Sequence, residues 1–281
     1  AQASVAQAPA GRTSTHLCAA WMVAAAAARH DVESDSCSDT ESSAVSTEAS
    51  EKGPVSGMPA YIRMGFIRKV YSILAVQLGI TVAIGAAFMR YATPEWTSEH
   101  MSLFFVACYG PLVLLLGMSC CCPAAGRKYP TNYLILFTLT LLESILVGFV
   151  VTWYTGQSVM IAVAATAVVF GCLTLYACCT STDFTGLGPY LYAALFSMIS
   201  FGMVLSLWSI FAPVPHGLRL VMAFCGVLLF SCYIVYDTKL IVGGGHKTEF
   251  DIDDYCFAAL NLYLDIINLF LYFLELCGNR N

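Results

Sequence analysis

The sequence predicts an all-α membrane protein in which about seven transmembrane helices form a bundle with a central last helix. Three observations lead to this class. The 281-residue chain is 58% hydrophobic and only 11% charged, with a mean hydropathy of +0.73, whereas soluble domains carry about 25% charged residues. Apolar stretches of about 20 residues recur along it, the length that crosses ~30 Å of hydrocarbon as a helix. The last stretch carries a polar stripe that lipid would not tolerate.

Residues 1–57 are predicted to be a disordered acidic segment that precedes the membrane domain at 58–281. The segment holds seven acids and three bases, and its stretch 31–52 is rich in Ser, Thr and acids. Such a composition cannot offset the entropy lost on ordering. An apolar run at 17–28 is too short to span and resembles the core of a signal peptide.

The membrane domain divides into apolar stretches separated by short polar connections. Helices are required because lipid offers no hydrogen-bond partners to a bare backbone. The connections at 155–158 and 213–216 are so short that the helices they join are antiparallel neighbours. The seven predicted spans are residues 70–89, 102–121, 133–153, 159–179, 190–211, 218–236 and 257–276.

Basic residues that flank the spans predict a cytosolic amino terminus. Arg90, Arg219 and Arg280 fall on the opposite side if the last stretch crosses completely. If that stretch re-enters and returns, Arg280 joins the cytosolic set, and the sequence leaves both topologies open. Neither part of the chain is basic enough to indicate a nucleic-acid partner. The predicted cytosolic bases are Arg63, Arg68, Lys69, Arg127, Lys128, Lys239 and Lys247.

Carboxylates within the spans are the residues that indicate a function. Glu143 and Asp265 lie well inside apolar stretches, and Asp237 lies at the cytosolic end of the sixth stretch. An ionised carboxylate in hydrocarbon costs about 2.5–3.5 kcal/mol, so each should face the bundle interior or water. For Glu143, a protonated carboxyl that hydrogen-bonds between helices explains the position equally well.

The last stretch carries its polar residues on one helical face. Their spacings follow the helical period, and one further heptad toward the amino end reaches Asp254. This face predicts that the last helix is surrounded by the other six. Hydrogen bonding between helices accounts for the asparagines and the tyrosine, but poorly for acids at three levels. The stripe consists of Asn261, Asp265, Asn268, Tyr272 and Glu275.

Asp237 and Asp265 are predicted to approach each other near the cytosolic mouth. The sixth helix is expected to continue to Val242 and to end at the glycines 243–245, about 9 Å beyond Asp237. Asp265 lies about 16 Å inside a helix that begins near Asp254. Two acids in a dry site are expected to share a proton. The pair is therefore a candidate proton-sensitive latch and a candidate transient site for Ca²⁺, which prefers oxygen ligands.

Several motifs in the membrane domain occur together, in the same order, in one family. The most specific are Tyr236-Asp237-Thr238-Lys239 and the run at 258–270, with Asp253-Asp254-Tyr255 between them. From about Tyr61 onward the chain resembles the transmembrane Bax-inhibitor-motif proteins, in particular the lifeguard and Golgi anti-apoptotic branch. Supporting matches lie at 66–71, 127–132, 137–138 with Glu143, and 182–185.

The resemblance implies a pH-sensitive calcium leak across the endoplasmic reticulum or Golgi membrane and suppression of apoptosis through lowered stored calcium. Asp237 and Asp265 match the family's paired aspartates, which act as proton sensor and gate. Bacterial members pair an arginine with these aspartates, and the nearest candidate here is Arg127. Calcium is the transported ion, and no cofactor is expected. The residues assigned to the pore or its polar support are Glu143, Asn261, Asn268, Asp254 and Arg127.

Two other functions stay open on the sequence alone. A non-conducting adaptor that binds cell-death regulatory membrane proteins conflicts with no feature. An intramembrane aspartyl protease would also use two membrane aspartates, and Tyr236-Asp237 fits one of its motifs. The second protease aspartate lies in GxGD, however, and here Leu262-Tyr263-Leu264 precedes Asp265. The expected protein is therefore not an enzyme, and its partners are the lipid bilayer, calcium and protons.

Overall fold

The computed structural model describes residues 60–121, 130–180, 182, 184–243 and 254–279. The predicted acidic segment 1–57 lies outside these residues. The described part of the chain is helical and contains no β-strand. Its elements are α2 (Ala60–Tyr91), α3 (Pro94–Glu99), α4 (Met101–Cys121), α5 (Thr131–Val151), α6 (Gly156–Cys179), the 3-10 turn η3 (Thr185–Leu187), α7 (Gly188–Phe211), α8 (His216–Val242) and α9 (Tyr255–Cys277).

Each of the seven predicted spans forms a single helix, namely α2 and α4 to α9. Six of these helices are long and apolar enough to cross a membrane, and α4 is apolar over Met101–Leu115. α2 begins at Ala60 rather than at residue 70, and the short helix α3 was not predicted. The prediction of an all-α, multi-pass membrane protein is confirmed, so the lipid bilayer is the solvent for most of its outer surface.

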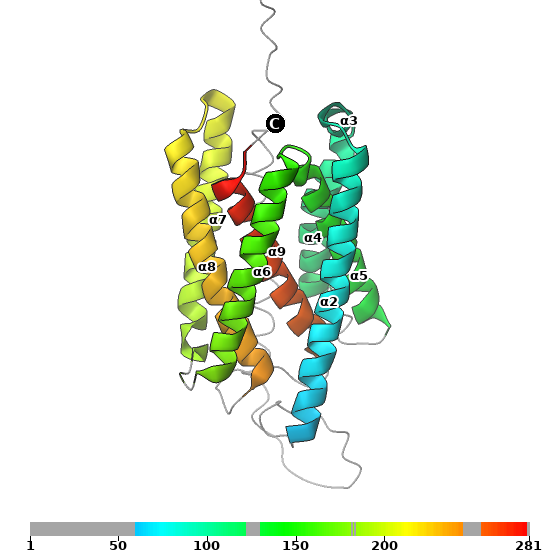
Figure 1. Ribbon diagram of the computed structural model, residues 1–281, viewed down its shortest axis with the longest axis vertical. Helices are drawn as coiled ribbons and strands as arrows, with labels where there is room; N and C mark the ends of the chain where they lie inside the picture. The colour runs from blue at the N-terminus through cyan, green and yellow to red at the C-terminus, as the bar shows by residue number, and fades with distance from the viewer. Residues whose placement is uncertain (1–59, 122–129, 181, 183, 244–253, 280–281) are drawn as a thin grey trace, which may run out of the picture.

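α9 is the central helix of the bundle, as predicted. It packs against α8, α6, α2 and α5, and most of its length is buried. Figure 1 shows it behind α6 and between α8 and α2. The expectation that all six other helices surround it needs correction, because α4 packs chiefly on α5 and α7 chiefly on α8. α4 and α7 carry no charged residue, so lipid can solvate their outer faces and nothing requires them at the centre.

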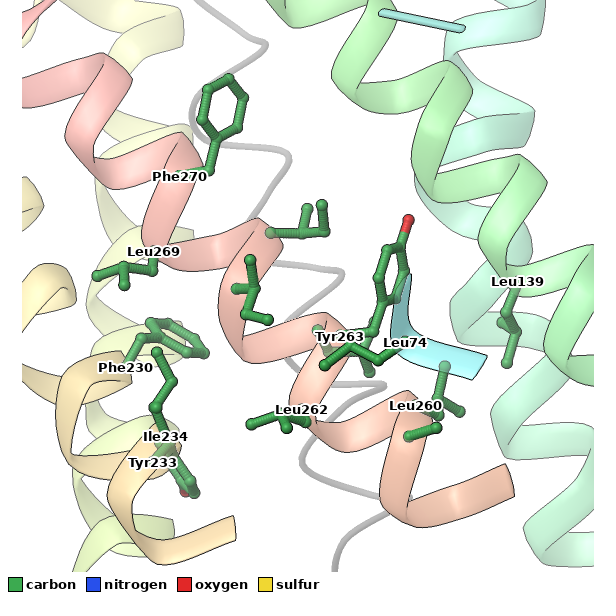
Figure 2. Close-up of a cluster of buried hydrophobic side chains, with 14 of the residues drawn as sticks. Leu74, Leu139, Phe230, Tyr233, Ile234, Leu260, Leu262, Tyr263, Leu269 and Phe270 are labelled. Carbon is green, nitrogen blue, oxygen red and sulfur yellow. The ribbon is translucent and has the colours of Figure 1, made fainter. Parts of the chain in front are cut away.

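Opposite sides of α9 contact different helices. Figure 2 shows Leu262 and Leu269 directed toward α8, where Phe230 and Ile234 lie, whereas Tyr263 points to the other side, beside Leu74 of α2. Lipid is as apolar as these side chains, so close packing rather than the hydrophobic effect holds the helices together. The two sides of α9 therefore form two separate helix contacts, which carry different polar groups.

The helices alternate in direction, and this alternation defines two ends of the bundle. α2 begins at the lower end in Figure 1, and α9 ends at the upper end, beside the α5–α6 connection. The turns from α5 to α6 and from α7 to α8 also lie at the upper end. The lower end and the upper end of the bundle are named by their positions in Figure 1.

Candidate functional site

The two predicted aspartates are both buried, on helices that pack against each other. Asp237 lies on α8, which ends at Val242 as predicted. The next residue, Gly243, has a φ of 69°, a conformation that glycine adopts without strain. Asp265 lies in the interior of α9, which begins directly after Asp254, again as predicted. Gly243, which follows the end of α8, and Asp254, which precedes the start of α9, therefore fix how far each aspartate lies from the lower end of its helix.

Aromatic packing determines which faces of α8 and α9 meet. The rings of Phe230 on α8 and Tyr272 on α9 stack with their centroids 5.9 Å apart. A Cβ atom on Gly226 would come within 2.6 Å of the Tyr272 ring, so the backbone of α8 lies directly against α9. Only glycine allows so close an approach without a shift of the ring.

The same faces carry the two aspartates. Asp237 is seven residues after Phe230, and Asp265 is seven residues before Tyr272. Seven residues make nearly two helical turns, a rise of about 10.5 Å that returns to the same face. Because the helices are antiparallel, both steps lead toward the lower end. Asp237 therefore lies on the side of α8 that contacts α9, and Asp265 on the side of α9 that contacts α8.

The other predicted stripe residues also face the protein interior. Asn261, Asn268 and Asp254 are buried, and the Asn268 side-chain amide donates to the Leu264 carbonyl at 2.8 Å. Asn268 Oδ1 has no hydrogen-bond partner among the described residues. Arg127, the candidate partner of the aspartates, lies outside the residues that the structure describes, and its role stays a prediction.

At the lower end, two lysines bind the termini of other helices. Lys239 on α8 is buried, and its ammonium donates to the carbonyl of Thr180, the C-cap residue of α6. A cation there compensates the partial negative charge of a helix C-terminus. The Lys69 ammonium of α2 lies 3.2 Å from the ring centroid of Tyr255 in the first turn of α9. That ring packs against Tyr133 of α5.

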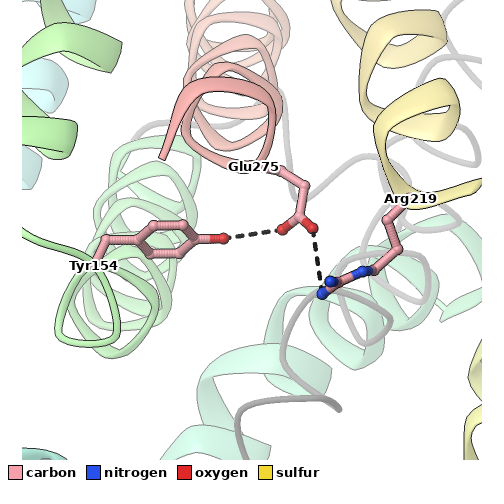
Figure 3. Close-up of polar contacts among 3 residues, drawn as sticks. All are labelled: Tyr154, Arg219 and Glu275. Atoms are coloured by element: carbon pink, nitrogen blue, oxygen red, sulfur yellow. Dashed lines mark hydrogen bonds and ion pairs between the residues drawn. The ribbon is translucent and has the colours of Figure 1, made fainter. Parts of the chain in front are cut away.

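At the upper end, Glu275 of α9 binds two other segments. Its carboxylate accepts a hydrogen bond of 2.9 Å from Tyr154, between α5 and α6, and pairs with Arg219 of α8 at 3.8 Å. Figure 3 shows the carboxylate between the tyrosine and the guanidinium. The three residues hold the end of α9 against both neighbours.

Main-chain hydrogen bonds fix the end of the last helix to the same place. The backbone N–H of Thr155 donates to the Asn279 carbonyl at 3.1 Å, and the Asn279 N–H donates to Ser158 Oγ at 2.9 Å. α9 is one continuous helix that reaches this point from the lower end. Of the two topologies that the sequence left open, the structure has the complete crossing.

A second polar cluster lies on the opposite side of α9, at its contact with α2 and α5. Thr81 of α2 contacts the hydroxyls of Ser144 on α5 at 3.0 Å and of Tyr263 on α9 at 2.8 Å. One turn away, the Gln77 amide donates to Thr140 Oγ1 at 2.9 Å. All of these side chains are buried. We call this contact the hydroxyl seam; it comprises Gln77, Thr81, Thr140, Ser144 and Tyr263.

The aspartates and the hydroxyl seam differ in the chemistry that they can perform. Carboxylates can exchange protons and accept cations, whereas hydroxyls and amides can only hydrogen-bond at ordinary pH. Among the described residues, no three His, Cys, Asp or Glu side chains come together as metal ligands. Ca²⁺ at Asp237 and Asp265 therefore stays a prediction of a passing ion rather than of a resident one.

Comparison with known proteins identifies the family. A model of the family described as "Inhibitor of apoptosis-promoting Bax1" matches residues 63–281, which include every described transmembrane helix from the fourth residue of α2 onward. The chain belongs to the Bax inhibitor family. The resemblance predicted from the sequence is thus confirmed.

Relatives within the Bax inhibitor family share about a third of their residues with the chain. Protein LIFEGUARD 3 of Arabidopsis thaliana is 37% identical over 76% of this chain and 84% of its own length. Protein lifeguard 3 of Homo sapiens is 33% identical over 78% of this chain and 70% of its own. The Golgi anti-apoptotic protein of Vaccinia virus is 34% identical over 81% of this chain and 90% of its own.

Sequence reasoning missed the hydroxyl seam and the contacts of Glu275 in this family member. A signal for the seam was present, because Gln77 and Thr81 are four residues apart, as are Thr140 and Ser144, so each pair lies on one helical face. Which faces meet could not be read from that spacing. Glu275 was placed on the stripe, but nothing in the sequence named Arg219 or Tyr154 as its partners.

Proposed function

We propose that this Bax inhibitor family protein is a pH-sensitive path through which Ca²⁺ leaks out of an intracellular store, and that the leak suppresses apoptosis. The observation that carries the proposal is the position of Asp237 and Asp265 on facing sides of α8 and α9, inside a membrane bundle. Acids inside a membrane domain are costly and mark ion or proton pathways. The protein needs neither enzyme activity nor a cofactor for this role.

The chemistry of two adjacent carboxylates explains both the ion and its dependence on pH. Two carboxylates that face each other in a dry site repel unless a proton or a cation lies between them. Ca²⁺ binds carboxylate and carbonyl oxygens, which Asp237, Asp265 and the nearby Asn261 and Asn268 supply. Protons and Ca²⁺ therefore compete for the same oxygens, and the flux depends on pH.

The distribution of charge supports an orientation with the lower end in the cytosol. Arg63, Arg68 and Lys69 lie in the first turns of α2, and Lys239 lies in the last turn of α8, all at that end. Basic residues next to membrane spans favour the cytosolic side. The name of the Vaccinia relative, Golgi anti-apoptotic protein, supports a Golgi location and an anti-apoptotic outcome. An endoplasmic reticulum location is the other part of the proposal.

The test is calcium efflux from liposomes that contain only the full-length protein, measured over a range of pH. Asp265→Asn removes one titrating group, so the change in efflux with pH should flatten, and Asp237→Asn should act in the same way. Glu99→Gln is a matched control, because Glu99 is an exposed acid at the end of α3, and its curve should follow the wild type.

A wild-type curve retained in both aspartate variants would disprove the gate. Efflux no greater than from protein-free liposomes would favour the alternative, a non-conducting adaptor that binds cell-death regulatory membrane proteins. Calcium flux is the property that separates the two functions, since both agree with the names of the relatives.

A further inference from the structure

Glu143 is a buried acid that the aspartate pair does not explain. Its side chain is 1% exposed, and neither carboxylate oxygen has a hydrogen-bond partner among the described residues. On α5 it lies one turn from Leu139 of the main core and one turn from Leu146 of a second apolar cluster. That cluster joins α4 and α5 and consists of Phe104, Ala107, Cys108, Leu146 and Phe149.

The groups that face Glu143 offer it no positive charge. α5 packs on α2, α4 and α9. The Cys108 thiol of α4 and the Tyr263 phenol of α9 lie within electrostatic range of Glu143, and both are neutral or negative but never cationic. α2 faces this part of α5 with Gln77 and Thr81, which do not titrate. No cation from these described neighbours compensates an ionised Glu143.

The donors of the adjacent hydroxyl seam are already in use. Thr140 donates its hydroxyl proton to the Leu136 carbonyl, and Ser144 donates to the Thr140 carbonyl. Thr81 donates to the Gln77 carbonyl, which leaves the Tyr263 hydroxyl to donate to Thr81. Each hydroxyl has one proton to give. The seam therefore has no spare hydroxyl donor for Glu143.

The seam also contains a second acceptor without a donor. Gln77 donates through its amide nitrogen to Thr140 Oγ1, but its buried Oε1 has no hydrogen-bond partner among the described residues. Gln77 contacts α5 at Thr140, which lies one turn from Glu143 on the same face. Together with the two oxygens of Glu143, this makes three buried acceptor oxygens without a hydrogen-bond partner among the described residues.

We propose that Glu143 is a proton-binding site separate from Asp237 and Asp265, which holds a neutral carboxyl against the hydroxyl seam. A proton converts one carboxylate oxygen of Glu143 into a hydrogen-bond donor, and the unpartnered Gln77 Oε1, which lies beside Thr140 one turn away, is the acceptor that we assign to it. Loss of the proton would leave a carboxylate among Leu139, Leu146 and Cys108, a state that requires water to enter between α4 and α5. Glu143 therefore stays protonated as long as these helices remain packed.

The test is infrared spectroscopy of the full-length protein in lipid bilayers, compared with Glu143→Gln. At neutral pH the protein that retains Glu143 should show the carbonyl stretch of one protonated carboxyl that the Glu143→Gln protein lacks. Both proteins carry Asp265→Asn as well, so that a proton shared by the aspartates does not contribute to the difference. A difference spectrum that contains only carboxylate bands would overturn the proposal.

An isotope experiment covers the case in which Glu143→Gln fails to fold. Glutamate labelled with ¹³C in its side-chain carboxyl should shift the Glu143 band of the protein that carries only Asp265→Asn, whereas labelled aspartate should leave that band in place. Among the described glutamates only Glu143 is buried without a hydrogen-bond partner, because Glu95 and Glu99 are exposed and Glu275 pairs with Arg219. A band that labelled glutamate does not shift would equally overturn the proposal. Neither readout depends on calcium flux, so the proposal on Glu143 can fail or succeed independently of the proposed function.

Discussion

The contacts that α9 makes on its two sides differ in what holds them together. Toward α8, the Tyr272 ring covers Gly226, and the acids Asp237 and Asp265 lie on the facing surfaces. Toward α2 and α5, the hydroxyl seam connects three helices through Thr81. One contact carries groups that can change charge, whereas the other consists of hydroxyls and an amide that cannot. The difference indicates that a change of pH can act on the α8 side of α9, whereas it leaves the hydrogen bonds of the seam as they are.

Enlarging the closest point of the α8 contact should have the largest effect. In Gly226→Ala the new methyl group would come within 2.6 Å of the Tyr272 ring, and relieving the overlap should destabilise the protein by about 1–3 kcal/mol. The free energy of unfolding in mixed micelles, titrated with SDS, measures the effect. Gly79→Ala is the control, because a Cβ at Gly79 meets nothing within 4 Å. Equal stabilities for the two variants would show that α8 and α9 are not in close contact at this point.

The hydroxyl seam should show a smaller but directly measurable coupling. Tyr263→Phe and Thr81→Val each remove one partner of the 2.8 Å contact. A double-mutant cycle in the same micelle assay should give a coupling energy of about 0.6–1.7 kcal/mol, the range for hydrogen bonds between membrane helices. Additive effects of the two substitutions would argue against a rigid seam and would remove the contrast with the α8 side.

The ion pair at the upper end should contribute least. Glu275→Gln keeps an oxygen that can accept from Tyr154 but removes the attraction to Arg219, whose side chain is 25% exposed. Partly exposed pairs contribute about 0.2–1 kcal/mol, and salt weakens them. Unfolding measured at low and high salt should show a loss of stability that shrinks as salt rises. A loss that is independent of salt would mean that packing of Glu275, rather than its charge, holds the end of α9.

Features of the fold could be predicted from the sequence where the residues that determine them lie within or next to the same helix. The ends of α8 and α9 followed from Gly243 and Asp254, which act within a few residues of the helix termini. The seven spans followed from length and apolar composition alone. The outer positions of α4 and α7 did not, because a helix that is apolar all round gives no signal about which face is inside.

In the candidate site, too, local features could be predicted from the sequence, whereas contacts between distant segments could not. Burial of Asp237 and Asp265 could be predicted because lipid penalises any other position for an acid. The partners of Thr81 lie 63 and 182 residues away in the sequence, and no periodicity within one helix indicates them. The orphan oxygens of Glu143 likewise depend on how neighbouring hydroxyls use their protons, which only the folded arrangement fixes.

The complete crossing by α9 has a consequence for anyone who attaches reporters to this protein. The first and last described helices open onto opposite ends of the bundle (Figure 1), and hydrogen bonds of Asn279 with Thr155 and Ser158 hold the last segment at its end. We expect two halves of a split fluorescent protein, fused before residue 60 and after residue 279, to lie on different sides of the membrane and not to reassemble. A protease confined to one side of a sealed vesicle would release one fusion and spare the other.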